Sequence, residues 1–279
     1  MRITISILLI AVVGFLEAGC DQTIQSDYQE QIVVGAFLYA GAPIDSIVLH
    51  RTTPLSSYYD DTDYAVTGAQ VTVTVDGVAH TLKPLAEKGR YYLPASELIV
   101  QGGKTYNLSI VAPNLQSGGV HNISATTTVP MPIHLSGLID SIHGQTFTLD
   151  TNNLSNFAFL VTATTTDASD SRFILSVTAL DTSFGRVHQG NLNADSSTFT
   201  RYSQQQTGPA VALTPNLIRW YGPNLMTIYA IDTNWWDYQR QVAGGGGDYQ
   251  PSLNHIVGAM GVFASGARDT VSVFIKPKQ

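Results

Sequence analysis

The strongest constraint on the fold is a series of short runs in which apolar and polar residues alternate, since a period of two is that of a β-strand with one buried face. In "QVTVTV", residues 70–75, Val71, Val73 and Val75 share one face. Asp76 and Gly77 follow directly, and this dipeptide favours the positive φ angles of a two-residue hairpin turn. We therefore predict a β-hairpin with its valines in the core.

Seven β-type runs occur between Gln31 and about Pro130, with turn residues between them. In chain order they are "QIVVGAFLYA", "DSIVLHRTTPL", "AQVTVTV", "VAHTLKPL", "GRYYLP", "KTYNLSIVAP" and "VHNISATTTVP". This number and spacing predict an immunoglobulin-like β-sandwich over residues 31–130.

Pro130-Met131-Pro132 stiffens the chain and marks a predicted boundary, after which residues 131–279 form a second, β-rich domain. There, "NFAFLVTATTTD" and "SRFILSVTALDT" predict a hairpin of two long strands. One short helix is expected from Asp232 to Val242, with Asp232 or Thr233 as its N-cap and Gly244 as its stop. The predicted fold class is all-β with a single short helix.

The amino terminus has the pattern of a secretory signal: Arg2, an apolar run from Ile3 to Leu16, then Ala18-Gly19-Cys20. The run is shorter than the roughly 20 residues that span a bilayer. Small residues directly before a cysteine resemble the lipobox of bacterial lipoproteins, which implies cleavage after residue 19 and lipid on Cys20. Glu17 stands where that motif usually has leucine, so an ordinary signal with an incidental cysteine is the alternative. Residues 20–30 would be a tether.

Composition agrees with an exported β-protein. Cys20 is the only cysteine, so the chain forms no internal disulfide. The net charge is −7, from 14 Lys+Arg against 21 Asp+Glu, with no basic cluster. This balance argues against binding to nucleic acid and against electrostatic docking on anionic lipid.

Several segments occur in the order of an uncharacterised Bacteroidetes-type outer-envelope lipoprotein family: "IVVGAFLYAGAPIDSIVLHRTTPL", "VTGAQVTVTVDG", "GRYYLP", "GKTYNLSIVAP", "ATTTVP" and "WWDYQRQV". The closing pattern N-I-x-G-x-x-G-V-F is carried by Asn254, Ile256, Gly258, Gly261, Val262 and Phe263, with His255 inserted. The chain resembles this family over nearly its whole mature length. The resemblance implies a domain of unknown function, often encoded beside TonB-dependent outer-membrane transporters.

Motifs for catalysis or metal binding do not withstand inspection. Gly103-Lys104-Thr105 has Leu98 where a phosphate-binding loop needs glycine, and it opens a strand instead of a helix. There is no Gly-x-Ser-x-Gly elbow, and the seven histidines are scattered singly, without zinc-ligand spacing. We predict no cofactor and no enzymatic activity, with an envelope hydrolase as the least favoured alternative.

Two clusters are candidate surfaces for a partner or ligand. In the loop "SSYYDDTDY", three acidic side chains lie between tyrosines, a combination that suits contact with a partner. The carboxylates of Asp60, Asp61 and Asp63 are also a weak candidate for calcium binding. The last third of the chain contains all three tryptophans, whose side chains suit either a binding hot spot or core packing. Trp235 and Trp236 are adjacent in the predicted helix, so their side chains point about 100° apart and need not share one role. The candidate residues are Tyr58, Tyr59, Asp60, Asp61, Asp63, Tyr64, Trp220, Trp235 and Trp236.

These features together predict a lipid-anchored binding or accessory protein of the bacterial outer membrane, partnering a TonB-dependent transporter. A structural or adhesive surface protein is the alternative. The sequence leaves open whether the protein faces the periplasm or the outside.

The anchor is directly testable. Mass spectrometry of the mature amino terminus should find Cys20 as the first residue, carrying a diacylglyceryl group on its sulfur. Substitution Cys20→Ala should release the protein from the membrane fraction. An unmodified Cys20, or cleavage elsewhere, would leave a secreted protein with no lipid anchor.

Overall fold

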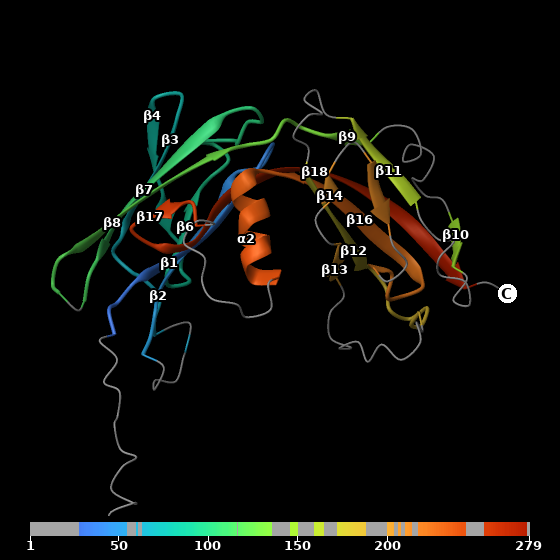
Figure 1. Ribbon diagram of the computed structural model, residues 1–279, viewed down its shortest axis with the longest axis horizontal. Helices are drawn as coiled ribbons and strands as arrows, with labels where there is room; N and C mark the ends of the chain where they lie inside the picture. The colour runs from blue at the N-terminus through green and yellow to red at the C-terminus, as the bar shows by residue number, and fades with distance from the viewer. Residues whose placement is uncertain are drawn as a thin grey trace, which may run out of the picture.

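The computed structural model describes residues 28–54, 60, 63–115, 117–135, 146–149, 159–164, 172–187, 200–203, 206–207, 210–213, 217–243 and 254–277 (Figure 1). In these residues the chain is built from strands and one helix, so the all-β prediction is confirmed.

The amino-terminal half is a β-sandwich. One of its sheets contains β1 (Ile32–Tyr39), β2 (Ile44–Arg51), β6 (Arg90–Leu93), β5 (Lys83–Pro84) and the start of β18 (Met260–Pro277). The facing sheet has the order β17 (Ile256–Val257), β8 (Val120–Thr128), β7 (Thr105–Pro113), β3 (Gln70–Val75), β4 (Val78–Thr81). Alternate residues of these strands, such as Leu49, Leu108 and Ile110, are almost fully buried between the sheets.

The predicted hairpin is present. β3 pairs with β4 across Asp76 and Gly77, whose φ angles are 50° and 79°. Val71, Val73 and Val75 face the core. All seven runs predicted between residues 31 and 130 form strands, and most of them bury one face; β4 and β5 are short, mostly exposed edge strands.

Strand β18 joins the two halves of the molecule (Figure 1). Its first residues, Met260–Gly266, lie parallel to β1, and Gly266–Ile275 lie antiparallel to β16 (Gly222–Ile231). Gly266 is opposite Tyr39 on one side and Ile231 on the other. The sandwich sheet therefore continues without interruption into the carboxy-terminal half.

The carboxy-terminal half extends this sheet. From β18 outward the order is β16, β12 (Arg172–Ala179) and then β13 (Thr200–Tyr202), with β14 (Gln206–Thr207) also on β12 and β10 (Thr146–Leu149) on β18. A separate sheet has the order β15 (Ala210–Leu213), β11 (Phe159–Thr164), β9 (His134–Leu135). A second core, including Phe173, Leu175 and Ile228, packs on the extended sheet.

The hairpin predicted from "NFAFLVTATTTD" and "SRFILSVTALDT" is wrong. β11 pairs with β15 and β9, whereas β12 pairs with β16 on one edge and with β13 and β14 on the other. Both edges of β12 are thus occupied by strands from later in the chain. Alternation identifies a strand but not its partner.

The sandwich is not completed by residues 31–130 alone. Ile256 and Phe263 belong to its core, and β17 and β18 pair with β8 and β1. The glycines of the closing motif serve this contact, because Gly258 and Gly261 have φ angles of 81° and 109°. A Cβ on Gly258 would lie 2.3 Å from the Asn122 carbonyl oxygen. The motif is therefore structural.

The predicted helix is confirmed as α2 (Thr233–Ala243). Asp232 caps it, since the Trp235 amide donates a 2.9 Å hydrogen bond to Asp232 Oδ1. The helix packs along β18 at the point where the two halves meet (Figure 1).

Gly261 provides a test of the closing motif. Its Cβ would lie 2.1 Å from the Val34 carbonyl oxygen, so Gly261→Ala should lower the free energy of unfolding by about 3 kcal/mol. Gly41→Ala is the control, because Gly41 also has positive φ (81°) but nothing lies within 4 Å of its Cβ position. It should cost only about 1 kcal/mol in urea melts of the mature chain. Equal losses would contradict the close approach of β18 to β1.

Candidate functional site

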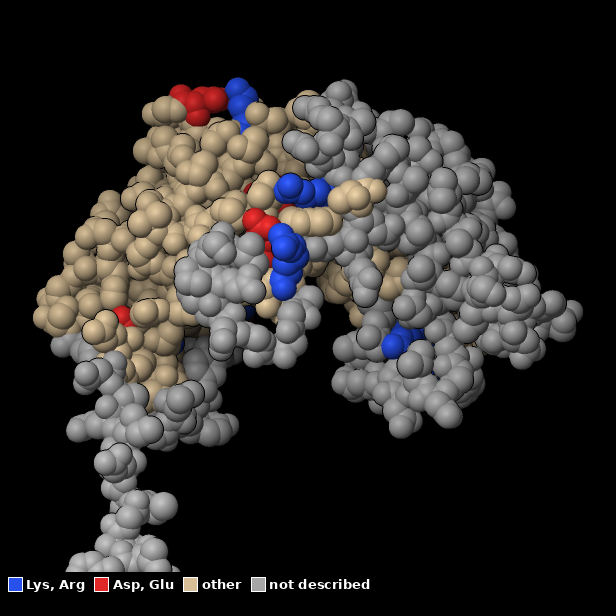
Figure 2. All heavy atoms as spheres, viewed as in Figure 1, with Lys and Arg blue, Asp and Glu red and all other residues tan. Residues whose placement is uncertain are grey.

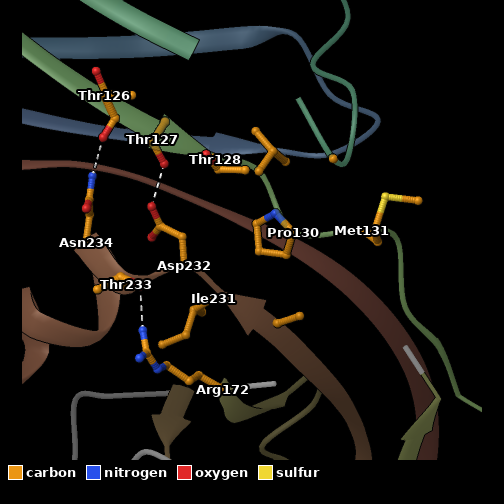
Figure 3. A pocket seen from close by; sticks show the side chains of 13 residues that line it. Thr126, Thr127, Thr128, Pro130, Met131, Arg172, Ile231, Asp232, Thr233 and Asn234 are labelled. Carbon is orange, nitrogen blue, oxygen red and sulfur yellow. Dashed lines mark hydrogen bonds between the residues drawn. The ribbon is translucent and has the colours of Figure 1, made fainter. Parts of the chain in front are cut away.

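A groove of about 580 Å³ opens where the sandwich, β12 and the start of α2 meet (Figure 3). Its walls come from the end of β8 and the following residues, from β12 and from the turn between β16 and α2. The described lining residues are Gly103, Thr126, Thr127, Thr128, Val129, Pro130, Met131, Arg172, Ala230, Ile231, Asp232, Thr233 and Asn234.

The floor of the groove is a polar joint, formed by Thr127, Asp232, Asn234 and Ser265. Thr127 Oγ1 donates to Asp232 Oδ2 at 2.5 Å and lies 2.7 Å from Ser265 Oγ. The Asp232 amide donates to the Ser265 carbonyl oxygen at 3.0 Å. Three elements, β8, β18 and the β16–α2 turn, are therefore fastened by polar groups at one end of the sandwich core.

Asn234 adds a bridge of its own. Its Nδ2 donates to the Thr126 carbonyl oxygen at 2.7 Å and to the Phe263 carbonyl oxygen at 2.8 Å. One amide group thus ties the first turn of α2 to an outward-facing carbonyl of β8 and to β18, and the orientation of α2 over the groove is fixed.

The carboxylate in the joint is electrostatically unusual. Burial raises the pKa of Asp232, although hydrogen bonds from Thr127 and from backbone amides act in the opposite direction. Both carboxylate oxygens accept hydrogen bonds, Oδ1 from the Trp235 amide and Oδ2 from Thr127. Both oxygens of Asp232 thus take part in holding the joint together.

The rim of the groove carries a cation over an aromatic ring. The Arg172 guanidinium lies 5.4 Å from the centroid of Trp236, and its Nη1 donates to Thr233 Oγ1 at 2.6 Å. Both Arg172 and Trp236 are only partly buried. Arg172 is the only cation among the described lining residues, and it stacks on Trp236 beside the groove.

Trp235 is not a surface residue, and its place among the candidate ligand-binding residues is corrected. It is 8% exposed and packs edge-on against Phe37, with ring centroids 4.9 Å apart. Tyr39 and Tyr229 complete its cage at 5.9 and 5.7 Å, and burial raises the pKa of Tyr39 to about 12. Adjacent helical positions point to different sides, so Trp235 fills the core while Trp236 is partly buried and stacks on Arg172.

Trp220 lies neither in the aromatic core around Trp235 nor beside the Arg172–Trp236 pair. It precedes β16, whereas Trp236 follows it, and ten strand residues separate the two by roughly 33 Å. Trp220 forms a cation–π pair with Arg186 at 5.0 Å. The three tryptophans, although close in sequence, do not form one surface.

The acidic and aromatic loop is only partly described. Cys20, Tyr58, Tyr59 and Asp61 lie outside the described residues.

In the described part of this loop, the Asp63 amide donates to the Asp60 carbonyl oxygen at 3.1 Å, and the Tyr64 carbonyl accepts from the Arg51 amide at 2.8 Å. Asp63 lines a shallow depression of about 300 Å³ beside Arg51 and Lys88. The depression adjoins Pro113, at the opposite end of β7 from the groove. The two candidate surfaces are thus at opposite ends of the sandwich.

Other charged groups gather over α2 and the junction, as Figure 2 shows for this face. Asp237 accepts from His255 at 2.9 Å and lies 3.5 Å from Arg240.

Among the residues that the structure describes, no three His, Cys, Asp or Glu side chains are grouped as metal ligands. No helix in the described part is long and apolar enough to cross a membrane. The calcium site stays a prediction, since Asp61 is not described.

Sequence reasoning identified Asp232 and Trp236 but missed Thr127, Arg172 and Asn234. Arg172 lies at the start of a hydrophobic strand, and Thr127 is one of three threonines in a row. Nothing in the local pattern distinguishes these residues. Within the polar joint, only Asp232 could be recognised from the sequence, as a candidate N-cap of the helix.

The fold defines an all-β protein with an immunoglobulin-like sandwich. The chain belongs to the family described as a domain of unknown function (DUF4249), which matches residues 20–270. No curated protein matches the sequence.

Solved structures similar to the chain include trypsin-activated alpha-2-macroglobulin from Escherichia coli, with 10% identity and a TM-score of 0.23, covering 88% of this chain and 16% of that one. DIP-gamma IG1+IG2 has 9% identity and a TM-score of 0.20, covering 91% and 99%. The central fibronectin-III array of RIM-binding protein has 9% identity and a TM-score of 0.21, covering 90% and 71%. At these TM-scores, the three structures support no inference about this chain.

The buried carboxylate predicts a pH dependence. Because the folded pKa of Asp232 is raised, its stabilising contribution is complete below the ordinary value of 3.8 and is lost as pH rises through the folded pKa. Asp232→Asn keeps the cap but carries no charge. The stability of this variant relative to the native chain should therefore increase with pH over that interval, measured by urea melts between about pH 3.5 and 7.

Thr127→Val is a second variant for this measurement, because it acts on the same carboxylate from the other side of the hydrogen bond. It removes a hydroxyl from the joint and leaves the carboxylate with one partner fewer, so it should cost about 1–3 kcal/mol. Its cost should be larger above the raised pKa than below it. Parallel pH curves for native and Asp232→Asn chains would contradict a raised pKa.

Proposed function

We propose that this protein is a lipid-anchored binding protein of the bacterial cell envelope, which holds part of a partner protein in the groove between the sandwich and β12. The groove carries the proposal, because its lining combines polar groups with Arg172, whose guanidinium stacks on the neighbouring Trp236. A finer part of the proposal is that the partner is a TonB-dependent outer-membrane transporter.

The chemistry of the lining favours binding over catalysis. Its described members offer one carboxylate, one guanidinium, one carboxamide and several hydroxyls, and no histidine, lysine or cysteine. Hydrolysis by a serine or threonine nucleophile requires an adjacent base, and the one carboxylate, Asp232, has both oxygens engaged. The groups present can accept and donate hydrogen bonds without activating a nucleophile.

The rim has the composition of a recognition site. Tryptophan and arginine are enriched among residues that dominate binding energy. Stacking on Trp236 and the hydrogen bond to Thr233 hold the Arg172 guanidinium in place. The remaining N–H groups of the planar guanidinium then have fixed directions in which they can donate to a ligand. An acidic or carbonyl-rich segment of a partner suits this rim.

The envelope location is supported by the signal-like residues 1–19 and by Cys20, the single cysteine of the chain. The transporter partner is supported by the resemblance to envelope lipoproteins described above. An adhesive polymer built by strand addition is less favoured, because the edge strands β4 and β5 of the sandwich have four and two residues. Such short edges are poor templates for pairing.

Paired substitutions test the groove. Arg172→Ala and Trp236→Ala should each weaken capture of the partner, after mild detergent extraction and chemical cross-linking, by about tenfold. Arg186→Ala and Trp220→Ala are matched controls, because they remove the same kind of cation–π pair at the far end of β16. The controls should leave capture unchanged.

The outcomes discriminate between the alternatives. If a transporter is recovered with the native protein and with the groove variants equally, the groove is not the binding surface. If self-assembled polymers are recovered in place of a transporter, the adhesive alternative is correct.

A further inference from the structure

The end of the sandwich where the chain enters the fold carries exposed apolar side chains on the β7–β8 hairpin. Leu115 is 70% exposed, Val120 57% and Val111 38%. Pro113 pairs with Val120, so Val111, Pro113 and Val120 project from the same outward face of the sheet, with Leu115 in the turn beyond them. We call these four residues the hairpin patch.

The start of the described chain is fastened to this same hairpin. Glu30 Oε1 accepts from the Leu115 amide at 3.2 Å and lies 3.3 Å from His121 Nε2. Glu30 Oε2 lies 3.3 Å from Arg51 Nε, in an ion pair that is more than nine-tenths buried. The point of attachment is thus a fixed part of the fold.

A second set of contacts holds the preceding residues. The Tyr28 hydroxyl donates to the Thr52 carbonyl oxygen, and the Gln31 amide donates to Thr52 Oγ1 at 3.0 Å. Figure 1 shows the β7–β8 turn beside the start of the described chain, at lower left. Any force applied through the amino terminus therefore acts at the end that bears the hairpin patch.

Covalent geometry limits how far this end can be from a lipid on Cys20. Tyr28 lies eight residues after Cys20 in the sequence, so eight Cα–Cα steps join them. Fully extended, they span at most about 28 Å. A bilayer that holds the lipid is then within reach of the hairpin patch.

We propose that the hairpin patch docks on the surface of the bilayer and inserts Leu115 among the lipid headgroups, so that the sandwich stands on the membrane with the groove at its far end. This inference depends on the lipid anchor of the proposed function. It specifies the orientation of the protein and the contact that sets it. A short lipid tether alone would leave the domain free to rotate.

The chemistry selects zwitterionic lipid. The patch itself has no charged residue. Beside it, Glu30 is paired with Arg51, and Asp63 and Lys88, of opposite charge, line the depression that Pro113 and Leu115 border. With a net charge of −7, the chain gains nothing from anionic headgroups. Apolar contact drives the docking, so it should not change with ionic strength.

The test uses the full lipoprotein in vesicles of phosphatidylethanolamine and phosphatidylcholine that contain brominated chains. Cys20 is the only cysteine, and lipid converts its sulfur to a thioether, so an introduced cysteine is the only free thiol. A fluorophore at Ser117→Cys reports on the turn and leaves the hairpin patch intact. A fluorophore at Val78→Cys is the control, because Val78 is 57% exposed at the other end of the sandwich.

The bilayer should quench the probe at residue 117 and leave the probe at residue 78 unquenched, at low and at high salt. Leu115→Asp, combined with Ser117→Cys, should lose this quenching. Because Leu115 is exposed, the variant should keep the native circular dichroism spectrum and still float with vesicles.

The failures can be told apart. If the protein floats but the probe at residue 117 is no more quenched than the probe at residue 78, the docking is refuted and the anchor stands. If the unsubstituted protein does not float, the anchor fails and the docking fails with it. Neither result bears on the groove, which is tested by partner capture.

Discussion

The structure depends on one strand that belongs to both halves of the molecule. β18 extends the sandwich sheet beside β1 and then forms the centre of the carboxy-terminal sheet beside β16. At the change of partner stands Gly266, where a Cβ would lie 3.0 Å from the ring of Trp235. Because the two parts of β18 pair with β1 and with β16 in turn, the two halves of the molecule share one sheet. The groove forms beside this shared strand, where the end of β8 meets β12 and the β16–α2 turn.

The polar joint has a defined task at that meeting point. Most of the contact between the two sheets of the sandwich is apolar, and apolar contact is not directional. Thr127 and Ser265, 2% and 0% exposed, replace apolar contact with hydrogen bonds to each other and to Asp232. Directional bonds between buried groups are costly to break, so they fix α2 at one angle. The rim pair, Arg172 and Trp236, takes its position from this fixed helix.

Much of the sandwich could be predicted from local pattern, because each strand of residues 31–130 alternates and each turn has suitable residues. Asp76-Gly77 and the N-cap Asp232 are positions where backbone geometry itself selects the residue type. The pairing of β12 could not be predicted, since its partners β13, β14 and β16 lie 20 to 60 residues later and any alternating strand would satisfy the same pattern. Arg172 and Thr127 were missed for the same reason.

The sequence by itself determined that this chain is all-β, that it has one short helix beginning after Asp232, and that Cys20 has no disulfide partner. These are properties of local periodicity, capping and counting. The tertiary structure alone decided that β18 closes the sandwich, that Trp235 is core while Trp236 stacks on Arg172, and that Glu30 lies against the β7–β8 turn. Each of these depends on which distant segments come together, and such contacts follow from packing and hydrogen bonding across the whole chain, which no local pattern contains.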